Sequence, residues 1–403
     1  MALISVDDAL AQLRAAADRR LAEQPLQVES VALLDALGRT LANDVIAPIN
    51  VPPERNSAMD GYAFAHADLQ HAPALPISQR IPAGHAPKPL QPGTAARIFT
   101  GGVLPEGADT VEMQENCREE DGLVHMLELP RLGANVRAAG EDIALGSLML
   151  TAGVRLGPVQ LGLLASVGLA HAEVFQRLKV VVLCSGNELV APGGQLQPGQ
   201  LFNSNQTMLT ALLRQQGCDV QVFESVADDL AATRQALKEA VRQGAQLIVS
   251  TGGVSVGEED HLRAAVQAEG RLDLWKVAIK PGKPLAFGYV QCVPFMGLPG
   301  NPQSAWVTSQ VLMLPFIGRL QGDISLPLSV PVPAGFTRNK AQGRREYVRV
   351  RLVPGDDGWP QLEAHGQQGS GVLSSAAWAD GLALVEAEAT VVPGQRLAFM
   401  PIK

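Results

Sequence analysis

The chain has 403 residues, a formal net charge of −8 and a hydrophobic content of 46%. This length exceeds what one ordinary core supports, so about two to four domains are expected. The acidic balance argues against a nucleic-acid-binding or anionic-membrane-binding surface, because either would need a basic face. An anionic substrate remains compatible with it where positive charge is concentrated locally.

The four cysteines stand far apart and form no CxxC pair. Neither a zinc framework nor a disulfide scaffold is therefore predicted. Cys184 and Cys292 lie in apolar runs, where we expect them to pack as small hydrophobic residues. No apolar segment reaches the roughly 20 residues that span a bilayer, and Ser5 with Asp8 forms a helix-capping pattern instead of a signal peptide. A cytoplasmic location is expected.

Residues 6–22 carry leucines at helical spacing with alanines between them, which predicts an amphipathic helix. Between Asp44 and Gly146 the prolines cluster and short strand-like runs replace the helical periodicity. Helical character returns at Pro158–Leu169. This order predicts a discontinuous helical N-terminal domain, residues 1–43 plus 147–176, with a β-rich domain of residues 44–146 inserted into it.

From Lys179 to about Leu320, strand-like and helix-like segments alternate. This is the pattern of a doubly wound, mostly parallel α/β domain, which we place at residues 177–324. Ligands of such sheets bind beyond the carboxyl ends of the strands. Acidic residues follow three predicted strands at that edge: Glu188 after the first, Asp228 and Asp229 after the second, and Glu258 to Asp260 after the third.

The remaining residues, 325–403, are predicted to form a small β-domain. Ser325–Pro333 is proline-rich and is interpreted as a linker. The segment EYVRVRLV, residues 346–353, alternates with a period of two, and turns at Pro354-Gly355 and Pro393-Gly394 separate further strands.

The most informative stretch is Ser250–Pro284, which reads STGGVSVGEEDHL and then VAIKPGKP. Glycines expose backbone N–H groups to anions, carboxylates hold hard cations, and lysines act as point charges for oxyanions. A Gly-rich turn alone is more often a plain strand-to-helix connection. Lys280 and Lys283, however, are held close together by Pro281 and Pro284, at a cost in repulsion that an anion would relieve.

Other polar segments have simpler alternative interpretations. One of Asp228 and Asp229 is explained as a helix cap, which leaves the other free for a ligand. In LPGNPQSA, Asn301 and Pro302 form a helix start, which suits an oxyanion but is explained almost as well by capping alone. The loop around Asp60 is explained equally well as a turn. No nucleophile motif and no metal-ligand spacing of histidines occurs, so covalent catalysis is not expected.

Six motifs occur in one order: NSAMDGYA (56–63), GEDI (140–143), SGNEL (185–189), TGGVSVGEED (251–260), IKPGKP (279–284) and GLPGNPQSA (297–305). Together they resemble the molybdopterin molybdenumtransferase family, which includes the bacterial MoeA proteins and the E-domain of gephyrin. The resemblance covers nearly the whole chain. It implies an elongated four-domain homodimer whose last domain is a small β-barrel.

The resemblance also implies site residues. The implied catalytic positions are Asp142, Glu188, Asp228, Asp260 and Lys280, with Asp228 and Asp260 as the metal ligands. The implied positions for binding molybdate and pterin are Asp60, Thr100, Ser255, Lys276, Lys283, Ser304, Arg349 and Ser370. Because the family is dimeric, the inserted domain that carries Asp60 and Thr100 is expected to serve the partner's cleft. The chain departs from many relatives at Asn187 and His261, where Asp and Tyr are common.

The implied reaction adds molybdate to the dithiolene of adenylylated molybdopterin and releases AMP, with Mg²⁺ as cofactor. A transient contact with the molybdopterin adenylyltransferase is expected as well. Two other functions remain open: a pterin-binding scaffold without turnover, and an unrelated Mg²⁺-dependent nucleotide hydrolase. The scaffold predicts that Asp260→Ala and Lys280→Ala are tolerated, and the hydrolase predicts ATP hydrolysis without pterin.

Overall fold

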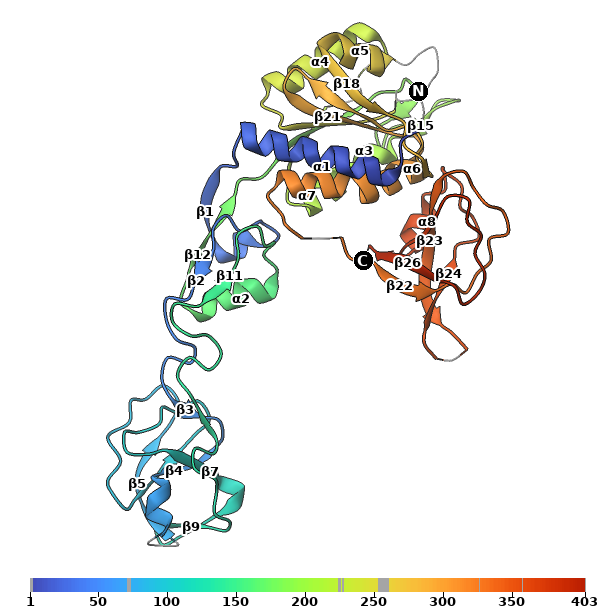
Figure 1. Cartoon of the computed structure of the whole chain (residues 1–403). Helices are drawn as coiled ribbons and strands as arrows, with labels where there is room; N and C mark the ends of the chain where they lie inside the picture. The colour runs from blue at the N-terminus through green and yellow to red at the C-terminus, as the bar shows by residue number, and fades with distance from the viewer. Residues whose placement is uncertain are drawn as a thin grey trace.

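The computed structural model describes residues 3–70, 74–223, 226, 228–252, 261–325, 327–356 and 358–402. The chain is elongated and multidomain (Figure 1), with an α/β part at one end and the C-terminal β-part beside it. A slender connecting part leads from the α/β part to the inserted β-part at the far end. Within the described residues, no helix is both long and apolar enough to cross a membrane.

A 6-stranded sheet forms the centre of the α/β part. Its order is β16 (Asp219–Val222), β13 (Lys179–Cys184), β17 (Leu247–Thr251), β21 (Val293–Leu298), β20 (Ala286–Val290) and β18 (Gly270–Trp275). The pairs from β16 to β21 are parallel, whereas β20 pairs antiparallel with both β21 and β18. Two antiparallel steps restore the strand direction, so β18 ends at the same edge as the parallel strands.

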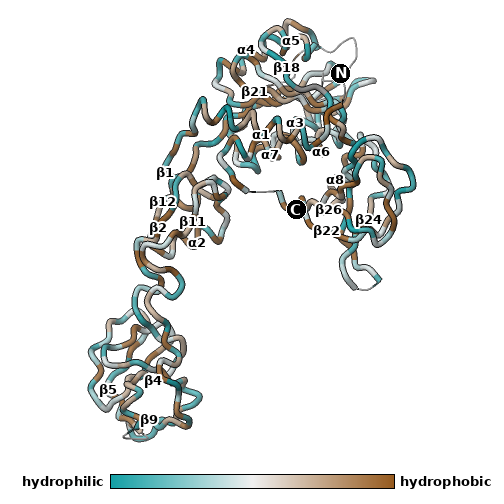
Figure 2. Tube along the Cα trace, in the orientation of Figure 1, coloured by the Kyte–Doolittle hydropathy of each residue, from teal (hydrophilic) through white to brown (hydrophobic). Residues whose placement is uncertain are grey.

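Alternation along the strands explains the layers of helices on the two faces of the sheet. Val180 and Val182 of β13 belong to a core shared with α1 (Val6–Glu23), α3 (Ser204–Gln215) and α7 (Leu314–Leu320). The intervening β13 residues pack instead with α4 (Leu230–Arg242) and α5 (His261–Glu269) on the other face. Apolar residues accordingly gather on the sheet and on the helix faces against it (Figure 2).

Helix α1 packs on the α/β part through a stripe of mostly small residues. Ala9, Leu13, Ala16 and Ala17 are buried there in the same core as the sheet. Ser5 caps the helix by accepting from the Asp8 N–H at 3.0 Å, as predicted. This packing differs from the expected grouping of residues 1–43 with 147–176. The physical reason is that alanines let α1 approach α7 closely, which the helix periodicity alone could not show.

The connecting part is a small mixed unit instead of the expected helical one. Strand β1 (Val28–Ala32) pairs antiparallel with β12 (His171–Phe175), and β2 (Val45–Ile46) pairs with β11 (Leu148–Leu150). The 3₁₀ helix η1 (Leu33–Ala36) and helix α2 (Pro158–Ser166) complete it.

The inserted part holds a second 6-stranded sheet. Its order is β7 (Thr110–Met113), β4 (Gly61–Phe64), β6 (Ala95–Ile98), β5 (Ala74–Ile81), β9 (Leu123–Met126) and β8 (Cys117–Glu120). Gly61 is required for the β4–β7 pair, since a Cβ there would lie 1.9 Å from the Glu112 carbonyl oxygen. Short strands β3 (Asn56–Ser57) and β10 (Val136–Arg137) pair with each other beside this sheet.

The C-terminal part is a curled sheet that reaches into the α/β part. Its order is β19 (Ile279–Lys280), β23 (Arg345–Pro354), β25 (Gly381–Val385), β26 (Arg396–Pro401) and β22 (Val330–Pro333), with β24 (Pro360–Ala364) also on β23. A bridge joins Ala334, just after β22, to Leu362 of β24. Because β24 pairs with β23, this bridge closes the sheet on itself. The short helix α8 (Ser374–Trp378) contacts β23.

Two expectations were wrong in detail. Val330–Pro333 is a strand that pairs with β26 and is not only a linker, because its prolines lie at the edge of the sheet. Cys184 is buried, as expected, but Cys292 is exposed. Cys292 lies in the tight turn between β20 and β21, where the preceding residue Gln291 has a φ of 52°.

The position of α1 makes a stability prediction. Leu13→Ala should destabilise the α/β part by about 2–5 kcal/mol, because it removes a fully buried side chain from a shared core. Urea unfolding followed by tryptophan fluorescence measures this, since Trp306 packs against the same core. The control Leu196→Ala, at an exposed site, should stay within about 0.5 kcal/mol of wild type. Equal midpoints for both variants would contradict the packing of α1 on the sheet.

Candidate functional site

The turn that carries the predicted lysines lies at the carboxyl edge of the central sheet. It connects β18 to β20, and Lys276, Lys280 and Lys283 all belong to it. The Lys276 N–H donates to the Leu285 carbonyl at 3.1 Å, and the Val277 N–H donates to the Lys283 carbonyl at 3.0 Å. The connection is therefore a closed hairpin with a lysine at its base and two near its tip.

The hairpin presses directly against helix α6 (Pro302–Thr308). Gly282 has a φ of +113°, and a Cβ there would lie 2.5 Å from Cγ2 of Thr308 and 3.4 Å from the Ser304 carbonyl oxygen. Only glycine suits this backbone conformation and this approach. Because Gly282 lies between Lys280 and Lys283, this approach brings both lysines into the neighbourhood of Ser304. Ser304 itself is 4% exposed.

The C-terminal part meets the same helix. The Gln303 N–H donates to the Ser370 carbonyl at 3.0 Å, which seats the loop carrying Ser370 at the start of α6. Asn301 is the N-cap residue and Pro302 opens the helix, as predicted, although the Asn301 side chain makes no capping bond. Ser370 and Ser304 thus come from different domains to adjoining positions.

Arg349 supports the Ser370 loop from beneath. Its side chain is fully buried and donates to Ser375 Oγ at 3.2 Å and to the Gly369 carbonyl at 3.4 Å. Burial lowers the pKa of Arg349 to about 10, because desolvation disfavours the charged form, and the field of Glu346 opposes that shift. In the structure this guanidinium positions the loop, and its direct contact with a ligand stays a prediction.

Sequence reasoning missed Glu346, the first acidic residue of β23. Ile279 and Lys280 pair in parallel with Arg345 and Glu346. The Glu346 carboxylate is buried, at 3.3 Å from Lys280 Nζ and 3.6 Å from Arg338 Nη2. No signal in the sequence pointed to this contact, because period-two alternation assigns faces within a strand but not its neighbours across domains.

Two predicted acids lie at the ends of neighbouring strands. Asp229 caps α4 by accepting from the Ala232 N–H at 2.8 Å, which confirms that one of the two aspartates is a helix cap. The role of Asp228 stays a prediction. The Asp228 N–H donates to Asn187 Oδ1 at 3.3 Å, so the asparagine that departs from many relatives keeps a useful acceptor. Glu188 is exposed, with its carboxylate folded over Gly186.

These carboxylates suit a hard cation by donor type. Among the described residues no cluster of three or more His, Cys, Asp or Glu side chains gathers. Mg²⁺ usually takes only one or two protein carboxylates and completes its shell with phosphate oxygens and water, so Asp228 beside the Glu188 turn fits that pattern. The predicted positions Ser255 and Asp260 lie outside the described residues.

Three predicted residues lie far from the lysine hairpin within one chain. Asp60 and Thr100 belong to the inserted part, at the opposite end of the elongated chain (Figure 1). Asp142 is exposed, and its N–H donates to the Val51 carbonyl at 2.9 Å where the chain leaves the inserted part. A single subunit therefore does not unite these residues with Lys280.

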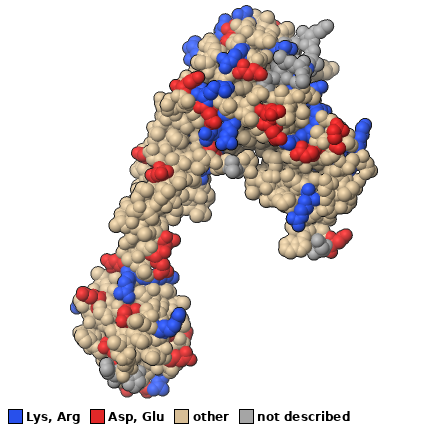
Figure 3. Space-filling model, viewed as in Figure 1, with Lys and Arg blue, Asp and Glu red and all other residues tan. Residues whose placement is uncertain are grey.

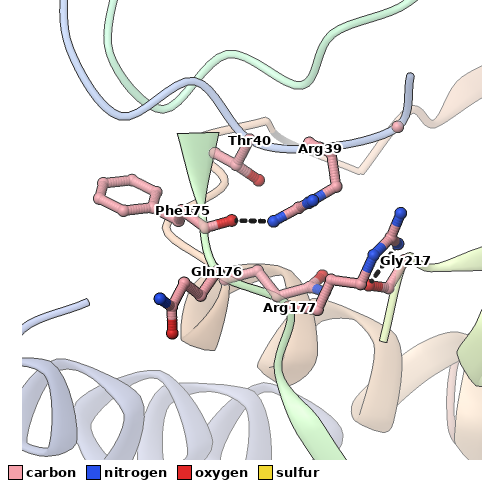
Figure 4. A pocket seen from close by; sticks show the side chains of 8 residues that line it. Arg39, Thr40, Phe175, Gln176, Arg177 and Gly217 are labelled. Carbon is pink, nitrogen blue, oxygen red and sulfur yellow. Dashed lines mark hydrogen bonds between the residues drawn. The ribbon is translucent and has the colours of Figure 1, made fainter. Parts of the chain in front are cut away.

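Two hollows lie at the amino edge of the sheet, away from the hairpin. The smaller, of about 10 Å³, has room for roughly one water, and in it Arg39 donates to the Phe175 carbonyl at 2.6 Å (Figure 4). The larger, of about 470 Å³, lies between the end of α1 and the start of β13. Acidic and basic side chains are interspersed over the face shown in Figure 3.

Asp60 and Thr100 provide a test by titration. The Thr100 N–H and hydroxyl donate to Asp60 Oδ1 at 2.7 and 2.8 Å, and they lower the pKa of Asp60. Thr100→Val should raise that pKa in an NMR titration of the carboxyl carbon, and Thr100→Ser should not. A carboxyl group whose pKa is lowered by folding stabilises the fold at neutral pH. That stabilisation is lost as pH falls through the pKa of the folded state. An unchanged Asp60 pKa in Thr100→Val would contradict this contact.

Comparison with known proteins identifies the family. Residues 4–168 match the MoeA N-terminal region (domain I and II), residues 181–319 a probable molybdopterin binding domain, and residues 331–402 the MoeA C-terminal region (domain IV). A molybdopterin biosynthesis MoeA protein structure from Pyrococcus horikoshii is 27% identical, with a TM-score of 0.77 and 100% coverage of both chains.

Curated relatives agree with these matches. The molybdopterin molybdenumtransferase of Haemophilus influenzae is 39% identical over 94% of this chain and 94% of its own length. The protein of that name from Nostoc is 35% identical, over 89% of this chain and 84% of its own. With its ordered motifs, its multidomain α/β fold and this coverage, the chain belongs to the molybdopterin molybdenumtransferase family.

Proposed function

We propose that this enzyme of molybdenum cofactor biosynthesis inserts molybdate into adenylylated molybdopterin and releases AMP. The observation that carries the proposal is the meeting of the lysine hairpin, the start of α6 and the Ser370 loop at the carboxyl edge of the sheet. This edge is where open α/β sheets bind ligands. The family's own name supports the substrate class.

The chain's residues act mainly by positioning. Molybdate is a tetrahedral dianion, and Lys280 and Lys283 lie on one short, closed hairpin. Two ammonium groups so placed neutralise the dianion, while hydroxyls and N–H groups near Ser304 orient its oxygens. Holding the oxyanion against the dithiolene makes the step effectively intramolecular, and this needs no enzyme nucleophile.

The acids serve the other end of the substrate. Asp228, with Asp260 as implied by the resemblance, would hold Mg²⁺ beside the phosphates. When bound, Mg²⁺ neutralises the pyrophosphate oxygens and assists departure of AMP. Glu188 lies at the neighbouring strand end, where the bridge between Ser185 and Val226 joins the two loops, and in this proposal its exposed carboxylate orients water.

A second copy of the chain completes the cleft in our proposal. The connecting part exposes large apolar side chains on several elements, among them Val28, Leu34, Leu37, Ile46, Leu148 and Val159, and Leu34 is 87% exposed. Gathered on one small unit, such residues mark an interaction surface. A homodimer through this part would let Asp60, Thr100 and Asp142 of each subunit reach the cleft of its partner.

Two finer points complete the proposal. We place the enzyme in the cytoplasm, since its four free cysteines suit a reducing compartment. We also propose a transient contact with the molybdopterin adenylyltransferase, because direct transfer would protect the adenylylated pterin from hydrolysis. Neither a nucleic acid nor a membrane is a partner in this account.

Activity tests the proposal directly. The purified enzyme, supplied with adenylylated molybdopterin, molybdate and Mg²⁺, should release AMP, and Lys280→Gln should lower the rate by about 100-fold or more. Lys179→Gln, at the opposite edge of the same sheet, is the charge-matched control and should leave the rate unchanged. A non-catalytic scaffold would show no AMP release at all, and a nucleotide hydrolase would consume ATP without pterin.

Mixing variants tests the shared cleft. Asp60→Asn and Lys280→Gln should each inactivate their own homodimers, because one residue of every cleft is lost. A heterodimer of the two has one cleft with both residues intact, so an equal mixture refolded together should recover about a quarter of wild-type activity. A mixture no more active than its parents would show that both residues serve the same subunit's cleft or that no dimer forms.

A further inference from the structure

Two cations from different domains share one buried carboxylate at the edge of the proposed cleft. Glu346 is 4% exposed, and its Oε1 lies 3.3 Å from Lys280 Nζ and 3.6 Å from Arg338 Nη2. Lys280 comes from the hairpin of the α/β part, whereas Arg338 follows β22 in the C-terminal part. The side chains of both cations remain about 30% exposed.

The group of three carries an unbalanced charge. One carboxylate against an ammonium and a guanidinium leaves one net positive charge, and the buried guanidinium of Arg349, which lies in the field of both Glu346 and Arg338, adds a second. Water screens these charges only partly. Lys283, close by on the hairpin, adds a further positive charge at an exposed position. These positive charges would roughly balance the two negative charges of a bound dianion.

The hydrogen-bonding capacity of Arg338 is also largely unfilled. Its Nη2 is buried without a hydrogen-bond partner, since Glu346 lies beyond hydrogen-bond range. In the described part of the chain, no hydrogen bond from the Arg338 side chain is seen, and Lys280 Nζ forms an ion pair with Glu346. A guanidinium presents planar, paired donors that match a tetrahedral oxyanion better than a point charge does.

We propose that Arg338 is a further residue that binds the molybdate oxyanion beside Lys280, and that Glu346 is the positioning residue that holds both cations. This inference rests on the proposed function. Glu346 itself does not contact the oxyanion in this proposal, because a carboxylate repels an oxyanion. It holds the ends of two long side chains beside one carboxylate, where a bound oxyanion would meet both.

The backbone supports this assignment. Residue 280 is paired with residue 346 in the β19–β23 ladder, and the Arg338 backbone is fixed to Val391 by two hydrogen bonds of 2.8 and 3.0 Å. Lys280 therefore starts from a strand and Arg338 from an isolated bridge, so the backbone of both cations is held by pairing, as a preorganised binding site requires. If this group served only to join the two domains, the ion pair between Lys280 and Glu346 would be enough. The presence of Arg338, with a donor that has no partner, would then be unexplained.

Molybdate binding to the full-length protein tests the inference. Titration calorimetry with sodium molybdate alone should show binding to wild type and a roughly tenfold or larger loss of affinity in Arg338→Gln. Lys340→Gln, two residues away and exposed, removes the same charge and should bind within about twofold of wild type. Arg338→Lys, which keeps the charge but not the paired donors, should fall between wild type and Arg338→Gln.

Kinetics separate binding from structure. In the AMP-release assay, Arg338→Gln should raise KM for molybdate and leave KM for the adenylylated pterin unchanged. Glu346→Gln should lower molybdate affinity in wild type but change little in the Arg338→Gln background, because its effect passes through that residue. Glu346→Asp, which keeps the charge, should recover part of the affinity.

The outcomes are distinguishable. Equal molybdate affinity in wild type, Arg338→Gln and Lys340→Gln would overturn the inference and leave the proposed function standing. No molybdate binding by wild type would overturn both. Where Arg338→Gln fails to fold, as judged by its thermal unfolding, Arg338→Lys takes its place, and wild-type affinity in that variant overturns the inference.

Discussion

Lys280 is held between two domains, because its strand β19 pairs with β23 of the C-terminal part and its ammonium contacts the buried Glu346 carboxylate. A buried carboxylate must keep its cations, since an unpaired charge in the interior is strongly destabilising. The contact therefore fixes the C-terminal part against the carboxyl edge of the central sheet. The Ser370 loop, the start of α6 and the lysine hairpin meet there as a consequence.

The long shape of the chain follows from a different constraint. The connecting part joins the two ends through narrow antiparallel pairs, β1 with β12 and β2 with β11, and it has only a small core of its own. Such a unit exposes apolar side chains that a larger core would cover. In the proposed homodimer, association of two chains through this part would account for both the exposed surface and the distance of Asp60 from Lys280.

Sequence patterns predicted local structure well and long-range contacts poorly. The apolar runs of β13 and β17, the Asp229 cap and the Ser5 cap follow from residue types at short spacing. The site residues of the hairpin and α6 came from motif order instead of physics. The place of α1 on the sheet and the Glu346 contact could not be foreseen, because both depend on which surfaces meet after folding. Helix α1 packs against residues hundreds of positions away, and Glu346 contacts a lysine tens of positions away.

Oxyanion binding where the hairpin meets the C-terminal part can be observed in an anomalous-difference map from crystals of the full-length protein soaked in molybdate. We expect a molybdenum peak beside Lys280, between Ser304 and the Ser370 loop, within reach of Arg338. A peak in the larger hollow at the amino edge of the sheet, near Arg177, or no peak at the hairpin, would contradict it.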